Sequence, residues 1–236
     1  MEIHIAYIYP ELLNLYGDKG NIASLKYRLE KRGYTCTLDI YNPGDAIDFE
    51  KADIIYLGGG TDKDNNTALC ELLKYKNEIK SYADNGGTML AVCGGFEMLG
   101  SFIEEDGKKR EALGVLDCYT VYGKERHIGN IVIDSPLSGG KIVGFENHSG
   151  NMHINSSEPL GNVVSGYGNG GTKGTEGIVY KNVVASYIHG PLLPKNPSLC
   201  DAILLMVLEK HGVSELETID DTLENTAHDY ATKRFS

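Results

Sequence analysis

The chain has 236 residues, of which 41% are hydrophobic and 23% charged, an ordinary composition for a globular protein with a sizeable core. Lysine and arginine number 22 and aspartate and glutamate 33, so the formal net charge is −11. A surface this acidic repels phosphate backbones and anionic lipids, which excludes nucleic acid as a partner. Since no apolar run approaches the roughly 18 residues that span a bilayer, we also expect no membrane insertion.

The cysteines and histidines indicate the compartment. Five cysteines are scattered without a CxxC pair, and seven histidines show neither HxH nor HExxH spacing. This pattern argues against a disulfide framework and predicts no metal site, so we expect a cytoplasmic protein. The first residues, MEIHIAYIYPELL, lack a basic segment and alternate in polarity, which indicates a first strand rather than a signal peptide.

The first half of the chain alternates strand and helix patterns. We predict strands at residues 2–9, 35–41, 52–60 and 88–92. We predict helices at residues 22–32 and 66–84. Asn21 is the expected N-cap of the first helix and Gly33 its C′ residue. The fourth strand is wholly apolar, as expected when both sheet faces are covered, so we predict an α/β fold with a mixed, mostly parallel, flavodoxin-like sheet and helices on both faces.

The second half consists mainly of short β-prone runs separated by Gly, Asn and Ser-Pro, and a helix is expected over 197–212. GYGNGG at 166–171 matches GxGxxG, but it lies between two β-prone runs, so we predict a hairpin there rather than a dinucleotide site. No phosphate-binding GxxxxGK[ST] occurs. We predict a single domain over 1–236, with a polar tail from about 214 that forms a loosely docked helix or serves a partner.

Cys93 ends the apolar run AVC and is followed at once by two glycines and a short amphipathic stretch. A strand that turns directly into a helix exposes its corner residue above the sheet edge, as in a nucleophile elbow. The helix N-terminus favours the thiolate, and the N–H of Gly94 would point toward an oxyanion on a carbonyl that Cys93 attacks. The alternative is that Cys93 is a small buried apolar residue.

Two further strand ends carry residues that suit this chemistry. His189 follows the apolar run VVASYI and could take the thiol proton. The glycines of GGGTD, 58–62, follow the third strand, and the N–H of Gly59 or Gly60 could complete an oxyanion hole. Taken singly, the histidine could be structural and the glycines a flexible turn. Because parallel strands end at one sheet edge, we expect all three features to converge.

These residues are similar to a known family. VCGGFEMLG (92–100) resembles the nucleophile segment of class I, triad-type glutamine amidotransferases, and GFENH (144–148) is typical of their cobyric-acid-synthase-like branch. LNLYGDKGNIASL (13–25), RHIGNIVID (126–134) and HGPLLPKNP (189–197) are similar to the glutaminase subunits of lipid II isoglutaminyl synthases. The resemblance covers nearly the whole chain.

The resemblance implies a reaction. Cys93 would attack the side-chain amide of L-glutamine, ammonia would leave, and water would hydrolyse the thioester. His189 would move the protons, Gly94 with Gly59 or Gly60 would stabilise the oxyanion, and Arg126 would bind the glutamine α-carboxylate. The residue type alone leaves Arg126 equally open to a solvated surface role. The ammonia would pass to a Mur-ligase-like synthetase subunit of the MurT type, which holds ATP and Mg²⁺ and amidates the D-glutamate of lipid II; this chain itself would need no cofactor.

The sequence departs from the family pattern at two positions. Pro191 stands where most members carry the acidic residue that orients the histidine, so the resemblance implies that the synthetase subunit supplies this carboxylate. Glu97 replaces the usual glutamine and lies near the expected substrate amide. Glu146 and His148 of GFENH either line the site or form a buried hydrogen-bonded pair.

Two alternative functions remain open. The chain could release ammonia for another acceptor, such as a corrinoid side chain. It could also be a non-catalytic binding or regulatory module of the same fold, although the combination of Cys93, Gly94, Gly95 and His189 argues against this.

Overall fold

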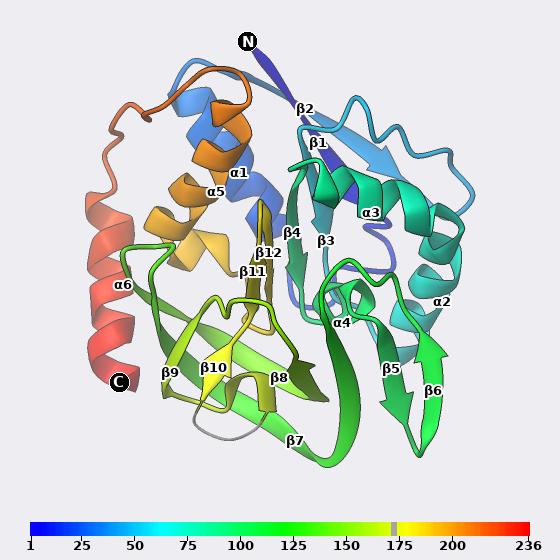
Figure 1. The fold of residues 1–236 in the computed structure, drawn as a ribbon. Helices are drawn as coiled ribbons and strands as arrows, with labels where there is room; N and C mark the ends of the chain where they lie inside the picture. Colours follow the sequence, from blue (N-terminus) through cyan, green and yellow to red (C-terminus); the bar gives the residue numbers. More distant parts are fainter. Residues whose placement is uncertain (171–173) are drawn as a thin grey trace.

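The computed structural model describes residues 1–170 and 174–236, which form two β-sheets with flanking helices (Figure 1). The first sheet has the order β11-β12-β4-β3-β1-β2. Its strands are β1 (Glu2–Ile8), β2 (Thr35–Tyr41), β3 (Ile54–Leu57), β4 (Thr88–Val92), β11 (Ile178–Tyr180) and β12 (Val183–Ser186). Neighbouring strands are parallel except β11 and β12, which confirms the predicted mixed, mostly parallel sheet.

Helices cover both faces of this sheet because alternate residues of each strand point to opposite sides. Ile54 and Tyr56 of β3 belong to the hydrophobic cluster that contains α1 (Lys19–Lys31) and α5 (Pro197–Glu209). Ile55 and Leu57 belong to the cluster on the other face, with α2 (Asp62–Leu72) and α3 (Lys76–Asp84). The strand is therefore buried on both sides.

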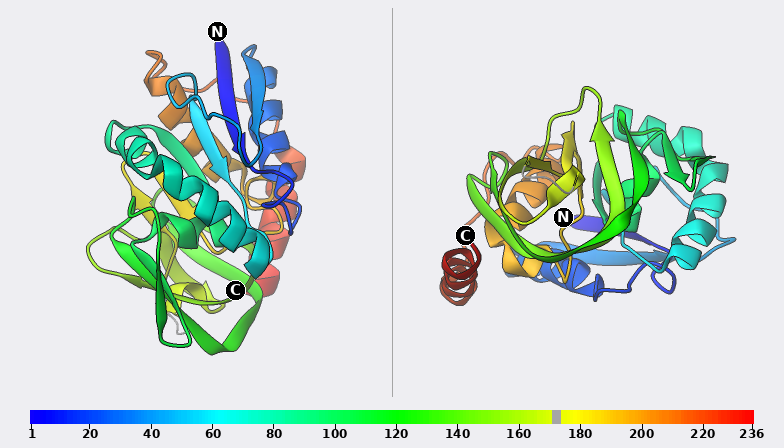
Figure 2. Two further views of the ribbon diagram at one scale, coloured as in Figure 1. Left: turned by 90° about the vertical axis from the view of Figure 1, so that its right-hand side faces the viewer. Right: turned by 90° about the horizontal axis from the view of Figure 1, so that it is seen from below.

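The second sheet lies at the carboxyl ends of the central strands (Figure 1 and Figure 2). Its strands are β5 (Phe102–Glu105), β6 (Lys108–Glu111), β7 (Cys118–Ser135), β8 (Gly140–Ile154), β9 (Gly161–Ser165) and β10 (Thr175–Glu176). Phe145 of β8 exchanges two backbone hydrogen bonds with His189, of 2.9 and 3.3 Å. The β-rich second half is thus confirmed, and it holds the segment that follows β12.

Asn21 is not the N-cap of the first helix, which corrects that prediction. The helix begins at Lys19, and the Asn21 side chain lies inside it, buried. Its Nδ2 donates to the Tyr56 hydroxyl at 2.8 Å, and its Oδ1 accepts from the N–H of Leu193 at 2.8 Å. Tertiary contacts, rather than the helix end, satisfy this amide. Gly33 follows the helix with φ +79°, as predicted.

The helix predicted over 66–84 is divided. Helix α2 begins earlier because Thr61 caps it, accepting from the N–H of Asp64, and a 3₁₀ turn, η1 (Leu73–Tyr75), separates it from α3. Tyr75, at the break, packs against Phe49 and donates its hydroxyl to the carbonyl of Asp45. These contacts come from segments remote in sequence, which the local pattern does not reveal.

The remaining elements are short or lie at the surface. They are α4 (Gly94–Leu99), η2 (Gly168–Gly170), η3 (Leu193–Lys195) and α6 (Thr222–Phe235). Strands β9 and β10 pair antiparallel, as expected for a hairpin around GYGNGG, although Gly171 of that motif lies outside the described residues. Helix α6 contains no buried residue and stands at the edge of the molecule (Figure 2). In the described parts of the chain, no helix has the length and apolar character needed to cross a bilayer.

Candidate active site

The three strand ends converge at one edge, as predicted. Strands β3, β4 and β12 are adjacent and parallel, so Gly58–Gly60, Cys93 and His189 all follow carboxyl ends of neighbouring strands. The N–H of Cys93 donates to the carbonyl of Ser186 at 2.8 Å, which ties the turn after β4 to the end of β12. This edge faces the second sheet, and the two sheets enclose the site between them.

Cys93 occupies the predicted strand-to-helix turn. Its backbone has φ 53° and ψ −113°, an uncommon conformation for a residue with a side chain. The surrounding loops maintain it: the N–H of Gly95 donates to the carbonyl of Gly58 at 3.0 Å, and a Cβ on Gly59 would fall 3.0 Å from the Cβ of Cys93. A side chain at position 59 would therefore crowd Cys93, and glycine lets the two turns approach each other closely.

A cavity of about 210 Å³ opens beside the sulfur of Cys93. Its walls come from both sheets and include Tyr16, Asn65, Gly94, Glu97, Tyr122, Arg126, Asn147 and His148. This volume suits a small polar molecule, and Cys93 is only 8% exposed.

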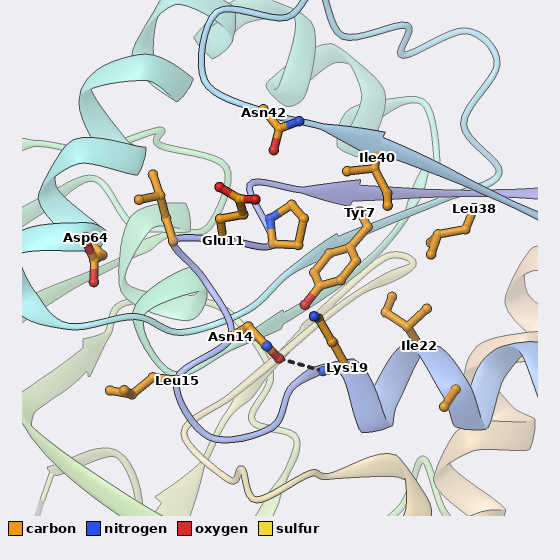
Figure 3. Close-up of a pocket in the computed structure, with 13 residues that line it drawn as sticks. Tyr7, Glu11, Asn14, Leu15, Lys19, Ile22, Leu38, Ile40, Asn42 and Asp64 are labelled. Atoms are coloured by element: carbon orange, nitrogen blue, oxygen red, sulfur yellow. Dashed lines mark hydrogen bonds between the residues drawn. The ribbon is translucent and has the colours of Figure 1, made fainter.

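A second cavity, of about 760 Å³, lies between α1, β2 and the loop that follows β1 (Figure 3). Its lining includes Tyr7, Ile22 and Ile40, and Leu15 lines both this cavity and the smaller one. Cys93 lines the smaller cavity and not the larger one, whereas His189 lines neither of the two. The chemistry therefore belongs to the smaller one.

The electrostatic environment of Cys93 differs from the expectation. Burial raises the pKa of its thiol well above the usual value, and the carboxylates of Glu97 and Asp18 raise it further. The N–H of Gly94 and the guanidinium of Arg126 lower this pKa by smaller amounts. Helix α4 has only six residues. The stabilisation of a thiolate by its N-terminus is smaller than the destabilisation caused by removing solvent from the sulfur. The thiol form, not the thiolate, is favoured here.

The three candidate oxyanion donors, Gly59, Gly60 and Gly94, differ in the group to which each N–H is directed. The N–H of Gly94 is directed at the sulfur of Cys93. By contrast, the N–H of Gly59 donates to Oδ2 of Asp18 at 3.0 Å, and that of Gly60 donates to Oδ1 of Asn65 at 2.8 Å. Gly94 is thus the one candidate whose N–H faces the reacting atom.

His189 is 1% exposed, and its ring stacks on that of Tyr16 with centroids 4.0 Å apart and planes at 13°. Neither ring nitrogen has a hydrogen-bond partner among the described residues, so the imidazole is not joined to the thiol of Cys93. Burial lowers the pKa of His189 to about 4, with His148, Lys195 and Arg126 adding smaller repulsions. The ring is therefore neutral near pH 7, the state that a general base requires.

Arg126 and Glu97 both line the cavity. Arg126 lies at the register shift of β7, and its Nε donates to Oδ1 of Asn147. Glu97 is 4% exposed and accepts from the hydroxyls of Tyr122 at 2.8 Å and Tyr187 at 3.0 Å. Burial raises the pKa of Glu97. The structure thus brings a cation and a carboxylate to the same small cavity as Cys93.

Glu146 and His148 lie side by side and are both buried, and His148 borders the cavity. Glu146 accepts from the N–H groups of Tyr167 and Gly168 and lies 3.5 Å from Nε2 of His148. Nδ1 of His148 donates to the carbonyl of Gly150 at 2.8 Å, and His148 lines the cavity. Of the two, only His148 lines the site, and its Nε2 has no hydrogen-bond partner among the described residues, so the pair is buried but not joined by a hydrogen bond.

Sequence reasoning missed several side chains at the site, among them Tyr16, Asp18 and Asn65. Tyr16 and Asp18 lie in LNLYGDKGNIASL, a stretch that carried a family resemblance but no assigned role. Asn65 lies three residues beyond GGGTD, close enough in sequence to have been considered with the glycine loop. Within the described residues, no group of three His, Cys, Asp or Glu side chains could hold a metal ion.

The comparisons with known proteins agree with this geometry. Residues 4–197 match the CobB/CobQ-like glutamine amidotransferase domain, so the chain belongs to that family, as the motif resemblance predicted. It is also similar to GatD, a subunit of the glutamine-hydrolysing lipid II isoglutaminyl synthase. It shares 40% identity with the Staphylococcus aureus GatD, over 94% of this chain and 92% of that protein. With the Streptococcus pneumoniae GatD it shares 41% identity, over 89% of this chain and 82% of that protein.

The fold is that of solved glutamine amidotransferase-like structures. A chain of the Thermotoga maritima PurLQS structure matches 89% of this chain and 100% of its own length, with a TM-score of 0.59 and 16% identity. This likeness concerns the fold and confirms the predicted fold class.

Proposed function

We propose that this chain is the glutaminase subunit of a lipid II isoglutaminyl synthase. It hydrolyses L-glutamine and passes the ammonia to a Mur-ligase-like synthetase subunit, which amidates the D-glutamate of lipid II. The GatD relatives, at 40–41% identity over most of the chain, support this assignment. Amide formation from a carboxylate requires activation, so ATP and Mg²⁺ belong to the synthetase subunit. The site of action is the cytoplasm.

Within this reaction, Cys93 attacks the side-chain carbonyl of glutamine, and His189 accepts the thiol proton and delivers it to the departing nitrogen. The N–H of Gly94 stabilises the oxyanion. Arg126 pairs with the α-carboxylate, for which its two terminal nitrogens have no competing partner among the described residues. Glu97 forms part of the wall of the glutamine site. Because the thiol pKa is raised, the proton transfer to His189 and the attack on glutamine are expected to be coupled.

The observation that carries this proposal is the state of His189. Its imidazole is buried on the same sheet edge as Cys93, and both ring nitrogens lack a partner. An unpaired buried polar group is costly, so such a group marks a place where another group binds. Pro191 occupies the usual position of the orienting carboxylate, and we propose that the synthetase subunit supplies it. Binding of the partner would then align His189 with the thiol.

The test compares the chain alone with its native complex. We expect glutamine hydrolysis to be at least about tenfold faster after the synthetase subunit is added, since the His189 orientation is completed only then. Cys93→Ser should abolish ammonia release in the complex without lowering the unfolding temperature. Equal turnover with and without the partner would exclude the shared triad, and normal turnover of Cys93→Ser would exclude the reaction. Assays with lipid II and with a corrinoid acid distinguish the two candidate acceptors.

A further inference from the structure

The side chain of Asn65 is a half-buried carboxamide in the first turns of α2. It lines the same cavity as Cys93 and Arg126. Its backbone N–H is used within the helix, donating to the carbonyl of Thr61 at 2.8 Å. The side chain is therefore not needed to cap the helix, a task that Thr61 performs.

The orientation of this carboxamide is determined by its hydrogen bond. The N–H of Gly60 donates to Oδ1 at 2.8 Å, and only the oxygen of an amide can accept. Nδ2, with its two N–H groups, must therefore point away from Gly60. The described residues offer Nδ2 no hydrogen-bond acceptor, so a donor at the cavity wall is left for a bound molecule.

The carboxamide lies directly against the residue that follows the nucleophile. A Cβ on Gly94 would fall 2.4 Å from Nδ2 of Asn65 and 2.4 Å from its Oδ1, so the carboxamide lies against Gly94 and would have to move if position 94 carried a side chain. Asn65 and Gly94 therefore lie against each other in the wall of the cavity that contains Cys93.

The chemistry requires a second donor at this position. Oxyanion holes stabilise the developing charge with two or more preorganised donors. Of the glycine N–H groups at the sheet edge, that of Gly59 is committed to Asp18 and that of Gly60 to Asn65 itself. Gly94 alone would leave the hole half formed.

We propose that Asn65 is a catalytic residue that donates a hydrogen bond from Nδ2 to the substrate oxyanion; this inference rests on the proposed function. As the sulfur of Cys93 bonds to the carbonyl carbon, the π electron pair moves to oxygen, which accepts from Asn65 and Gly94. The thiol proton passes to His189. When the pair returns, the C–N bond breaks, and the nitrogen takes that proton and leaves as ammonia. Gly60 acts by holding the amide in this orientation.

Asn65→Asp is the most direct test in the synthetase complex. The aspartate retains an acceptor for the N–H of Gly60 and replaces the donor with an oxygen. We expect kcat to fall by about 10²–10³-fold, with KM changed by less than about threefold. Asn65→Ala removes the donor without adding charge and should give a loss of similar size. Asn66→Asp, the same change one residue along the helix, is the matched control, since Asn66 contacts Arg110 outside this cavity.

A second measurement distinguishes stabilisation of the oxyanion by Asn65 from a contribution of Asn65 to substrate binding. The γ-semialdehyde of glutamate should form a thiohemiacetal with Cys93 that carries an oxyanion, so its affinity should fall in both Asn65 variants by about the same factor as kcat/KM. Unchanged kcat in both variants, a loss confined to KM, or faster turnover of Asn65→Ala would each overturn the inference while leaving the proposed function intact. A wild-type complex that releases no ammonia from glutamine would overturn the proposed function and the inference with it.

Discussion

Two polar clusters, one between the helices and one at the edge of the central sheet, are built in opposite ways. Arg28 of α1 is 3% exposed and makes two hydrogen bonds to Asp201 and two to Asp221, all of 2.6–2.7 Å. These contacts join α1 to α5 and to the segment before α6. At the sheet edge, by contrast, both nitrogens of His189 and Oδ1 of Asp18 have no partner among the described residues.

This difference indicates that the Arg28 cluster stabilises the fold, whereas the groups near Cys93 serve function. The donors of Arg28 meet acceptors in the folded chain, so the cluster is complete and closes the molecule around its helices. Near Cys93, the His189 ring and Oδ1 of Asp18 are desolvated without a hydrogen-bond partner among the described residues, and burial displaces the pKa values of Cys93, Asp18 and His189. Incomplete pairing, combined with the positive φ of Cys93, marks the edge as a site that substrate and partner complete.

The largest expected effect is on catalysis at the incomplete cluster. His189→Ala should lower ammonia release by about 10³–10⁴-fold in the complex, because no other imidazole is held at the end of β12. The unfolding free energy should change by less than about 1 kcal/mol, since the lost packing on Tyr16 is offset by removal of two unpaired polar atoms. Turnover and urea denaturation of the same preparations provide the check, and a loss of stability above 3 kcal/mol would contradict it.

A substitution in the Arg28 cluster should have the reverse effect: it should lower stability and leave turnover nearly unchanged. Arg28→Met leaves two carboxylates without their main partner, although both are partly exposed and Asp201 keeps Arg32. We expect a loss of about 2–3 kcal/mol in unfolding free energy, somewhat less than for fully buried pairs. Turnover per folded molecule should stay within about twofold of wild type, because none of these residues lines the catalytic cavity. A comparable loss in kcat would show that the two clusters are coupled.

The smallest expected effect is on the pH dependence of the unfolding free energy. In wild type the contributions of Asp18 and His189 have opposite signs and largely cancel. Burial raises the pKa of Asp18 from 3.8 to about 6, so the native state holds a proton that the unfolded state lacks between these values, and stability falls as pH rises. Burial lowers the pKa of His189 from 6.5 to about 4, so the unfolded state holds the extra proton and stability rises with pH. From about pH 4 to 6 the two slopes oppose each other.

Single substitutions should reveal the two slopes. In Asp18→Asn the unfolding free energy should rise by about 1–2 kcal/mol between pH 4 and 6, and in His189→Ala it should fall by a similar amount. Denaturant titrations at pH 4, 5 and 6 measure both, with wild type as the flat reference. Two variants with parallel pH profiles would show that these groups do not titrate as their burial requires.

The strongest sequence predictions concerned local patterns and the topology that follows from them. The apolar run before Cys93, the glycines after it and the strand-end position of His189 were sufficient to predict one shared edge. This succeeded because parallel strands joined by helices must end on the same side of a sheet. The family resemblance then supplied the glutaminase reaction, which these patterns alone left among several acyl-transfer chemistries.

What the tertiary structure decided was the partner of each polar group. Asn21 looked like a helix cap because only its neighbours were visible in the sequence, whereas Tyr56 and Leu193 satisfy it in the fold. The same holds for Gly59 and Gly60, whose N–H groups are taken by Asp18 and Asn65.

The amino-acid sequence by itself determined the alternation of elements, the turn that carries Cys93 and the edge on which the reacting groups meet. The pKa directions of Cys93 and His189, and the orientation of the Asn65 amide, were decided only in three dimensions. Burial and hydrogen-bond partners depend on segments that are far apart in the chain, and these set the free energy of each charged or polar group.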